Sequence, residues 1–159
     1  MAMPTTEATT PEISPVRAPL EVLLATDGSE QAELAAELVA RFLPPGTRVE
    51  LLTVLSLSLS TFGYMGELSD AKQRHARIEE ATAEATSPSR EILEQAGHVI
   101  KVRHRLGNPP DEVLAEIERT APDLVVVGRR GLGRAASLVL GSVSSFLLRR
   151  SPAPILVVP

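Results

Sequence analysis

The segment GRRGLGRAASLVLGS, residues 128–142, holds the residue types of this chain best suited to binding an anion. Its glycines let backbone amides approach a bulky anion closely and supply conformations with positive φ. Gly141 and Ser142 open a predicted helix, whose first amides and dipole favour phosphate, and the Ser142 hydroxyl adds a donor. The same segment carries three arginines: Arg129, Arg130 and Arg134. The pattern predicts a phosphate-binding loop, although glycines that merely turn the chain would give the same spacing.

Two familiar nucleotide-binding loops do not fit this segment. A Walker A loop needs a Gly-Lys pair, but the two lysines of the chain, Lys72 and Lys101, do not follow a glycine. Residues 131–136 match the letters G-x-G-x-x-A, but a dinucleotide-binding fingerprint also needs an acid about 20 residues later to hold a ribose. No Asp or Glu follows Asp123. The remaining pattern is G-x2-G, nine further residues, and then Gly-Ser.

Asp27 is the acid best placed to join the same site, because it follows the first apolar run, residues 22–25, after one threonine. A carboxylate there can hold a ribose, stabilise a turn or orient a water molecule. Enzymes dedicated to phosphoryl transfer add a lysine or further carboxylates with Mg²⁺, and the motif has neither. We therefore expect nucleotide binding with slow or absent hydrolysis and no catalytic residue.

The remaining reactive side chains have simpler interpretations. Ser29 precedes a predicted helix and is expected to cap it, since no histidine is placed in the sequence to activate its hydroxyl. His98 and His104 share one face of a predicted strand but are six residues apart, too far for one metal ion. The chain has no cysteine, so we expect neither a metal site nor a disulfide.

Length and composition narrow the class of protein. A chain of 159 residues with 43% apolar residues is the size of one domain with a real core. The net charge is −4, yet residues 124–159 carry five arginines and no carboxylate, which predicts an anionic ligand there, with chance clustering as the alternative. An acidic protein is a poor candidate for broad nucleic-acid binding. Without an apolar run of about 18 residues or a signal peptide, we expect a cytoplasmic protein that contacts no membrane.

Strand and helix patterns alternate along residues 20–159, after an arm at 1–19 that holds four prolines and is predicted to be flexible. The predicted strands are 22–25, 49–55, 98–106, 124–127 and 155–158. The predicted helices are 30–43, 70–96, 109–119 and 142–150. We expect a kink or break near Pro88, because proline lacks an amide donor. Alternating Ser and Leu at 55–60 predict that the second strand continues with one polar face before a loop.

Alternating strands and helices are the signature of a parallel sheet that is covered on both faces. The strands are nearly continuous in apolar residues, as strands buried on both sides are. We therefore predict an α/β fold with a single doubly wound, Rossmann-like sheet of five parallel strands in the order 3-2-1-4-5. Ligands of such sheets bind beyond the carboxyl ends of the strands, where the winding reverses. The loops that contain Asp27 and Gly128 follow two of these ends.

The G-x2-G-x9-G-S/T pattern of residues 128–142 resembles, without a gap, the nucleotide-binding signature of the universal stress protein family. The opening VLLATDGSE and the closing LRRSPAPILVVP are similar to that family's first and last strands. The resemblance covers about residues 20–159. Within the family, this motif separates ATP-binding members from those that bind no nucleotide. The sequence departs from the family in its double arginine after Gly128 and in Pro88.

The resemblance implies a site that surrounds an adenine nucleotide. Asp27 would lie by the ribose and adenine, with Ala25 and Thr26 lining the pocket, and Val54 would contact the adenine. The residues on the phosphate side would be Gly128, Arg129, Arg130, Gly131, Gly133, Gly141, Ser142 and Val143. Asp27 and both glycine-rich ends also follow from the residues themselves, whereas Val54 rests on the resemblance alone.

The expected function is that of an ATP-binding stress-response regulator, with Mg²⁺ as the accompanying ion and an unidentified protein partner. Two alternatives remain open: a weak ATPase or nucleotidyl-transfer enzyme, and a dimeric scaffold that binds AMP, cyclic AMP or no nucleotide. The apolar last strand, residues 155–158, would lie at a sheet edge that invites pairing. The resemblance implies a homodimer through this strand, from Ile155 to Val158, with an isologous contact.

Overall fold

The computed structural model describes residues 19–56, 71–131 and 140–159. In these ranges five strands form one sheet, in which all neighbouring strands are parallel, in the order β3-β2-β1-β4-β5. The strands are β1 (Glu21–Ala25), β2 (Arg48–Leu55), β3 (Val99–Leu106), β4 (Leu124–Gly128) and β5 (Ile155–Val158). The predicted parallel sheet and its strand order are confirmed.

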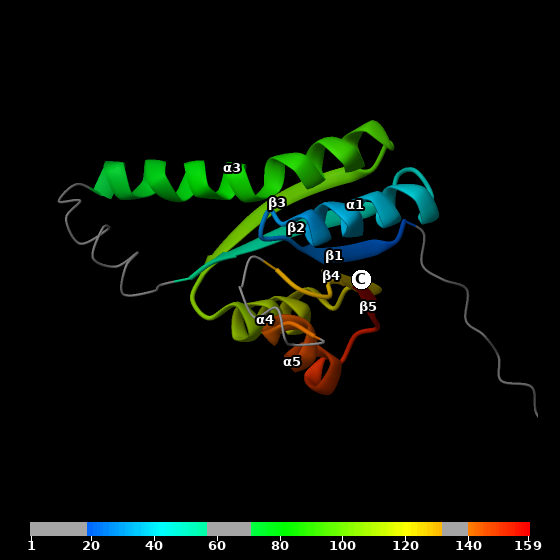
Figure 1. Ribbon diagram of the computed structural model, residues 1–159. Helices are drawn as coiled ribbons and strands as arrows, with labels where there is room; N and C mark the ends of the chain where they lie inside the picture. Colours follow the sequence, from blue (N-terminus) through cyan, green and yellow to red (C-terminus); the bar gives the residue numbers. More distant parts are fainter. Residues whose placement is uncertain (1–18, 57–70, 132–139) are drawn as a thin grey trace, which may run out of the picture.

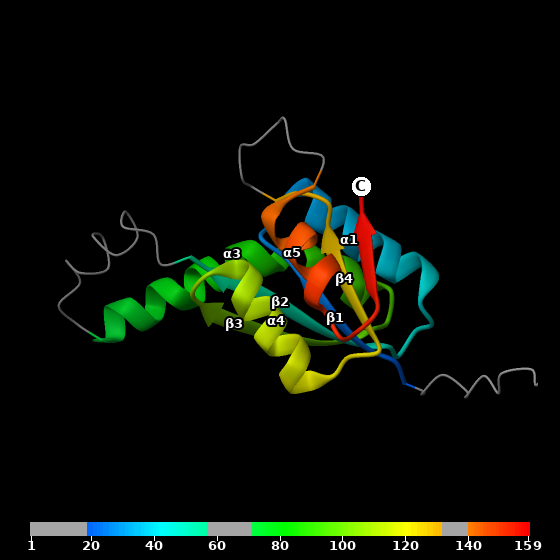
Figure 2. The same cartoon turned by 90° about the horizontal axis from the view of Figure 1, so that it is seen from below.

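Helices cover both faces of the sheet, as Figure 1 and Figure 2 show. α1 (Glu30–Phe42) and α3 (Ala71–Gln95) lie on one face, and α4 (Pro109–Thr120) and α5 (Ser142–Arg150) lie on the other. The chain therefore leaves β1 toward one face and leaves β4 toward the opposite face. Because β1 and β4 are neighbours, the winding reverses between them, which opens a crevice at their carboxyl ends.

Two apolar layers hold the sheet between its helices. Val22 and Leu24 of β1 are buried in the layer under α1 and α3, whereas Leu23 is buried in the layer under α4 and α5. Ile117 of α4 and Leu147 of α5 are fully buried in this second layer. Successive residues of β1 thus enter opposite layers, as a strand covered on both faces requires. Each buried leucine contributes about 1.5–3 kcal/mol to folding.

α1 does not bury the stripe that its large side chains mark. Leu34, Leu38 and Phe42 recur at four-residue steps, yet Leu34 and Phe42 are exposed. The buried residues are small, apart from one valine: Ala32, Ala35, Ala36 and Val39. Small side chains let a helix axis approach a sheet closely. Close packing on the sheet therefore determines which face of α1 is buried, and the spacing of its large apolar residues does not.

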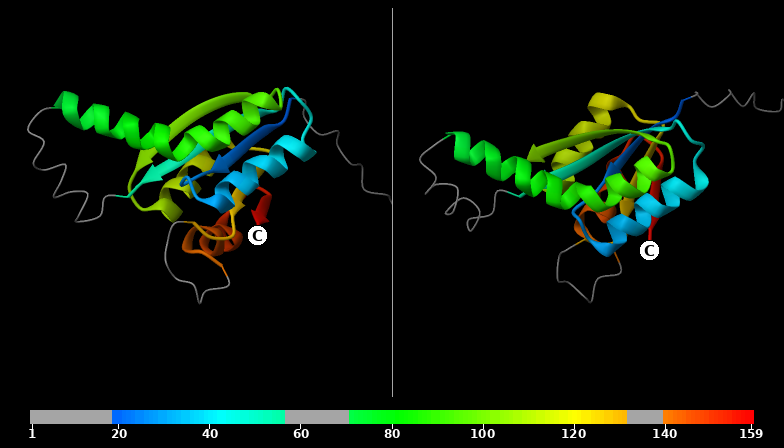
Figure 3. Two further views of the ribbon diagram at one scale, coloured as in Figure 1. Left: turned by 45° about the horizontal axis from the view of Figure 1, so that its top comes forward. Right: turned by 90° about the horizontal axis from the view of Figure 1, so that it is seen from above.

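α3 runs as one continuous helix through Pro88, so of the two predicted outcomes, a kink or a break, the break is wrong. Thr86 and Ser89, on either side of the proline, are buried against the rest of the molecule. The Thr86 hydroxyl also donates to the carbonyl of Thr82 (2.8 Å) within the helix. Burial of these neighbours holds the helical path where proline cannot donate. Figure 3 shows the first part of α3 projecting beyond the sheet.

Other predictions fall partly or wholly outside the described ranges. β2 ends at Leu55, and residues 57–60 of its predicted continuation are not described; the same holds for residues 1–18 of the predicted arm. Within the described ranges, no helix has the length and apolar character needed to span a membrane.

His98 lies directly before β3 and is buried, with 6% of its surface exposed. Its backbone N–H donates to the carbonyl of Leu93 (3.1 Å), which ties the end of α3 to the start of β3. Burial lowers the pKa of His98 from its ordinary value of 6.5, because the charged imidazolium would lose its hydration.

The buried His98 predicts a loss of stability at mildly acidic pH. The unfolded chain takes up a proton near pH 6.5 and the folded protein only at lower pH, so protonation favours unfolding as the pH falls below that value. We expect the Tm of the wild type to fall as the pH is lowered from about 7.5 to about 5.5. The Tm of His98→Leu should fall less over the same pH range. Thermal unfolding followed by circular dichroism measures both, and an equal fall in the two proteins would contradict the prediction.

Candidate functional site

A cavity of about 610 Å³ opens at the carboxyl ends of β1, β2 and β4. It lies where the winding reverses, and its volume is within the range of small-molecule sites. Eleven of the twelve binding residues predicted from the sequence line it. They are Ala25, Thr26, Asp27, Val54, Gly128, Arg129, Arg130, Gly131, Gly141, Ser142 and Val143. The twelfth, Gly133, lies outside the described ranges, as does Arg134.

Asp27 and Gly131 approach each other closely at the wall of the cavity. The Asp27 carboxylate accepts a hydrogen bond from the backbone N–H of Ser29 (3.1 Å), which orients it in the turn after β1. A Cβ atom added at Gly131 would lie 2.0 Å from Oδ2 of Asp27. The loop after β4 can therefore lie this near the carboxylate only with a glycine at position 131.

The loop after β4 is bonded to the start of α5. The N–H of Gly141 donates to the carbonyl of Arg129 (2.7 Å), and the Ser144 hydroxyl donates to the same carbonyl (2.9 Å). The N–H of Arg129 donates in turn to the carbonyl of Val158 in β5. These two amides are occupied within the protein, so the cradle of backbone amides is smaller than the glycine pattern predicted.

α5 begins without a side-chain cap. Its N-cap residue is Gly141, which has no side chain to accept from the first amides, and the Ser144 hydroxyl is bonded to carbonyls. α1 differs, because the Ser29 hydroxyl accepts from the N–H of Ala32 (3.3 Å), which confirms the predicted cap. The first amides of α5 have no partner within the helix. Since residues 141–144 line the cavity, the positive end of the α5 dipole meets it.

Two arginines, Arg129 and Arg130, line the cavity. Their Nε atoms are buried and have no hydrogen-bond partner among the residues that the structure describes. A buried donor without a partner costs about 1–3 kcal/mol, a cost that an anion in the cavity would remove. Arg149 and Arg150, from the same acid-free segment, are exposed at the far end of α5, where Arg150 lies 4.9 Å from the ring centre of Phe146. The positive charge at the cavity therefore comes from Arg129 and Arg130, and not from Arg149 and Arg150.

The other end of the cavity, around Val54, is largely apolar, and sequence reasoning located it only in part. Its further lining residues come from β2, α3 and α4: Leu52, Thr53, Leu55, Ser56, Ala85, Pro109 and Val113. The sequence could have predicted Pro109, because it closely follows the third strand. The carboxyl ends of all strands in a parallel sheet lie along the same edge, where ligands bind. Nothing in the sequence points to Ala85, whose carbonyl accepts from the Thr26 hydroxyl (3.1 Å).

The charged groups of the cavity are few. Among its described lining residues, Asp27 is the one carboxylate, and no lysine or histidine is present. His98 and His104 lie elsewhere, one directly before β3 and one within it. In the part of the chain that the structure describes, no three His, Asp or Glu side chains form a group that could hold a metal ion. The arrangement suits binding of an anion more than acid–base chemistry.

Known proteins share this architecture. A universal stress protein of Thermus aquaticus is 34% identical over 140 residues, which cover 86% of this chain and 96% of the relative. The structure of MJ0577, from Methanocaldococcus jannaschii, has a TM-score of 0.73 and 28% identity and covers 88% of this chain and 95% of that one. A universal stress protein in complex with cAMP has a TM-score of 0.58 and 25% identity over 89% and 98% of the two chains.

The family model of the universal stress protein family matches residues 21–159, from the start of β1 to the end of the chain. The family model and the sequence match to the relative thus cover nearly the whole region that forms the five-stranded sheet. This chain belongs to the universal stress protein family.

Proposed function

We propose that this protein binds an adenine nucleotide in the cavity, with ATP as its main ligand. The observation that carries the proposal is the division of the cavity into two environments. One end is largely apolar, and the other is lined by Arg129 and Arg130, whose Nε atoms have no partner among the described residues, and by the uncapped start of α5. A flat base and a charged polyphosphate need such a pair of environments in one site. The related protein in complex with cAMP supports an adenine nucleotide.

The proposed arrangement assigns each part of the nucleotide to a part of the cavity. The base lies between Val54 and the start of α4, and the ribose lies near Asp27, beside Ala25 and Thr26. The phosphates lie toward the two arginines, the glycines after β4 and the first turn of α5. The contributing residues there are Gly128, Gly131, Gly133, Ser142 and Val143, with Gly141 shaping the loop.

Binding without rapid turnover is the second part of the proposal. Dedicated phosphoryl-transfer sites combine several carboxylates or a lysine around Mg²⁺. The described wall of this cavity offers Asp27 as its one carboxylate and no lysine. ATP, with its Mg²⁺, would thus act as a signal that changes the surface presented to a protein partner. Slow hydrolysis that needs Asp27 is the alternative, and single-turnover assays of wild type and Asp27→Ala distinguish the two.

Calorimetric titration with ATP, AMP and cAMP tests the binding proposal. We expect ATP to bind most tightly, because its longer phosphate chain can reach the guanidinium groups of both Arg129 and Arg130. The double variant Arg129→Gln/Arg130→Gln should weaken ATP binding by about tenfold or more, since charge-assisted hydrogen bonds contribute about 1.5–3 kcal/mol each. AMP affinity should fall less.

The variant Arg149→Gln/Arg150→Gln is the matched control, because it removes the same charge from the exposed end of α5. Its ATP affinity should equal that of the wild type. Equal losses in the two double variants would mean that overall charge, and not the cavity, attracts the nucleotide. A wild-type protein that binds none of the three nucleotides, with or without Mg²⁺, would remove the proposal.

Gly131→Val should abolish nucleotide binding and leave the fold intact. The new side chain would displace the Asp27 carboxylate, which a Cβ atom at Gly131 already meets at 2.0 Å, while Gly131 itself is exposed and outside the core. The same substitution in an Asp27→Ala background should then have a much smaller effect. Calorimetry and thermal unfolding of the four proteins measure this; loss of folding in Gly131→Val would assign the glycine a purely structural role.

We also propose a homodimer through β5, the apolar edge strand from Ile155 to Val158. Leu156 leaves 41% of its surface exposed there. Leu156→Arg should convert the dimer to a monomer, because two copies of the new charge would meet across an isologous contact. Leu34→Arg on α1, at a leucine 44% exposed, is the matched control and should remain dimeric. Sedimentation velocity measures both, and a monomeric wild type would refute the proposal.

A further inference from the structure

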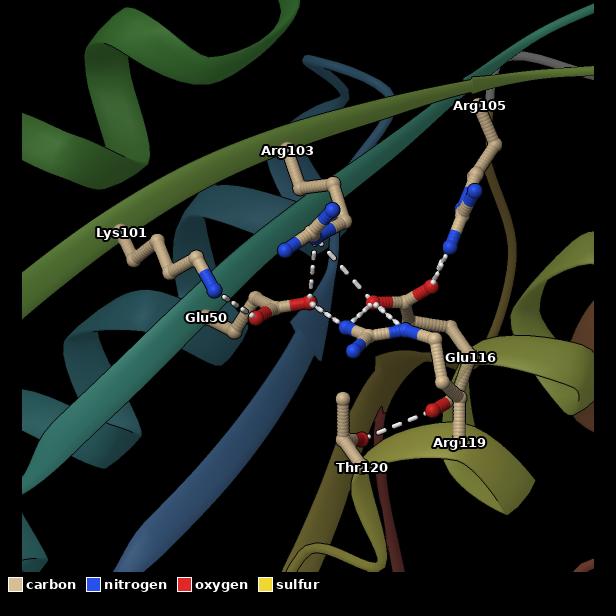
Figure 4. Close-up of polar contacts among 7 residues, drawn as sticks. All are labelled: Glu50, Lys101, Arg103, Arg105, Glu116, Arg119 and Thr120. Carbon is tan, nitrogen blue, oxygen red and sulfur yellow. Dashed lines mark hydrogen bonds and ion pairs between the residues drawn. The ribbon is translucent and has the colours of Figure 1, made fainter.

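A buried carboxylate on α4 joins this helix to the edge of the sheet. The Glu116 side chain is fully buried and lies among three arginines, as Figure 4 shows: Arg103 and Arg105 of β3 and Arg119 of α4. Arg105 donates to one carboxylate oxygen through Nε (3.0 Å) and Nη2 (2.5 Å). Arg103 Nε lies 3.2 Å from the other oxygen, to which Arg119 also donates. Both oxygens of Glu116 are therefore paired.

The charge on Glu116 is stable near neutral pH. Burial by itself would raise the pKa of Glu116, but hydrogen bonds with Arg119, with the neighbouring Glu50 carboxyl and with Arg105 outweigh burial and lower the pKa to about 2. A buried charge that loses its partners strongly destabilises a protein. The position of α4 against β3 is thus held by charge pairing as well as by apolar contact.

This ion pair lies one helical turn from the apolar end of the cavity. Val113, which lines the cavity, precedes Glu116 by three residues, and both are buried on the inner side of α4. On the sheet, Arg105 is the register partner of Val54, the lining residue of β2. The strand ends and the helix that carry the ion pair are therefore also those that border this end of the cavity.

The connection before α4 holds the helix at its first residue. The N–H of Gly107 donates to the carbonyl of Leu55 at the end of β2 (3.1 Å). A Cβ atom on Gly107, whose φ is +153°, would lie 2.8 Å from Oε1 of Glu112, so the first turn of α4 packs directly on this connection. With this end of the helix fixed near Pro109, the remaining freedom of α4 is a swing that the Glu116 contacts restrain.

We propose that the Arg105–Glu116 ion pair positions α4 and so sets the width of the base compartment, the part of the cavity between Val54 and Val113. Neither charged residue is among the described residues that line the cavity, so both act through the wall of α4. The inference rests on the proposed nucleotide site. It makes affinity for the base depend on Arg105 and leaves affinity for the phosphates independent of it.

Arg105→Gln tests this positioning role, because Glu116 keeps Arg103 and Arg119 and the fold is retained. Two ligands separate the ends of the cavity: ATP, which has a base, and inorganic tripolyphosphate, which has none. We expect ATP to bind about tenfold more weakly to Arg105→Gln, while tripolyphosphate affinity changes less than about twofold. Arg105→Lys, which keeps the charge but donates from one nitrogen, should recover part of the ATP affinity.

Arg48→Gln is the matched control for the loss of an arginine ion pair on the sheet. Arg48 pairs with Glu21 (3.0 Å) at the opposite, amino-terminal ends of β2 and β1. It should bind ATP and tripolyphosphate as the wild type does. Unchanged ATP affinity in Arg105→Gln, or equal losses for ATP and tripolyphosphate, would overturn the inference. A wild-type protein that binds neither compound would instead refute the proposed function.

Hydrogen exchange of the ligand-free protein tests the positioning role without any nucleotide. Amides of α4 beyond its first turn, residues 114–120, should exchange faster in Arg105→Gln than in Arg48→Gln at matched stability, because the helix swings more freely about its first turn. Equal exchange in the two variants would overturn the inference even if nucleotide binding were confirmed.

Discussion

The neighbouring strands β1 and β4 send the chain to opposite faces of the sheet, and the other features of the site depend on this reversal. The connection after β1 turns toward α1, and the connection after β4 leads to α5 on the far side. Neither helix then covers the carboxyl ends of the two strands, which leaves the crevice occupied by the cavity. Burial of β1 on both faces maintains the reversal, because Leu23 and Leu24 are held in separate apolar layers.

In the segment after β4, some polar groups form hydrogen bonds within the protein and others have no such partner among the described residues. The amides of Gly141 and Arg129 are bonded within the protein, which fixes the loop against α5 and β5. The guanidinium Nε atoms of Arg129 and Arg130 and the uncapped start of α5 are not satisfied in this way. A folded protein tolerates few buried donors without partners, and these belong to residues that line the cavity, which supports the proposal of an anion there.

The opposite wall is held by charges that do not reach the cavity. Glu116 is buried with three arginines around it, which compensate its charge within the protein. Replacing such a cluster with apolar residues would often leave stability unchanged, so stability alone does not explain it. A defined distance between α4 and the sheet is a property that directional ion pairs provide and that apolar packing provides less strictly.

Local patterns predicted the strands and most helix boundaries correctly, because apolar periodicity and flanking glycines and prolines act over a few residues. They allowed a break at Pro88, where the helix in fact continues between buried neighbours, and they did not identify the buried residues of α1. By itself the sequence determined the order of the elements and the parallel sheet, since both follow from neighbouring residues; the anion-binding character of residues 128–142 stays a prediction. Only the tertiary structure decided which amides of that segment are already bonded and that Ala85 and Val113 complete the cavity, because those contacts join residues far apart in the chain.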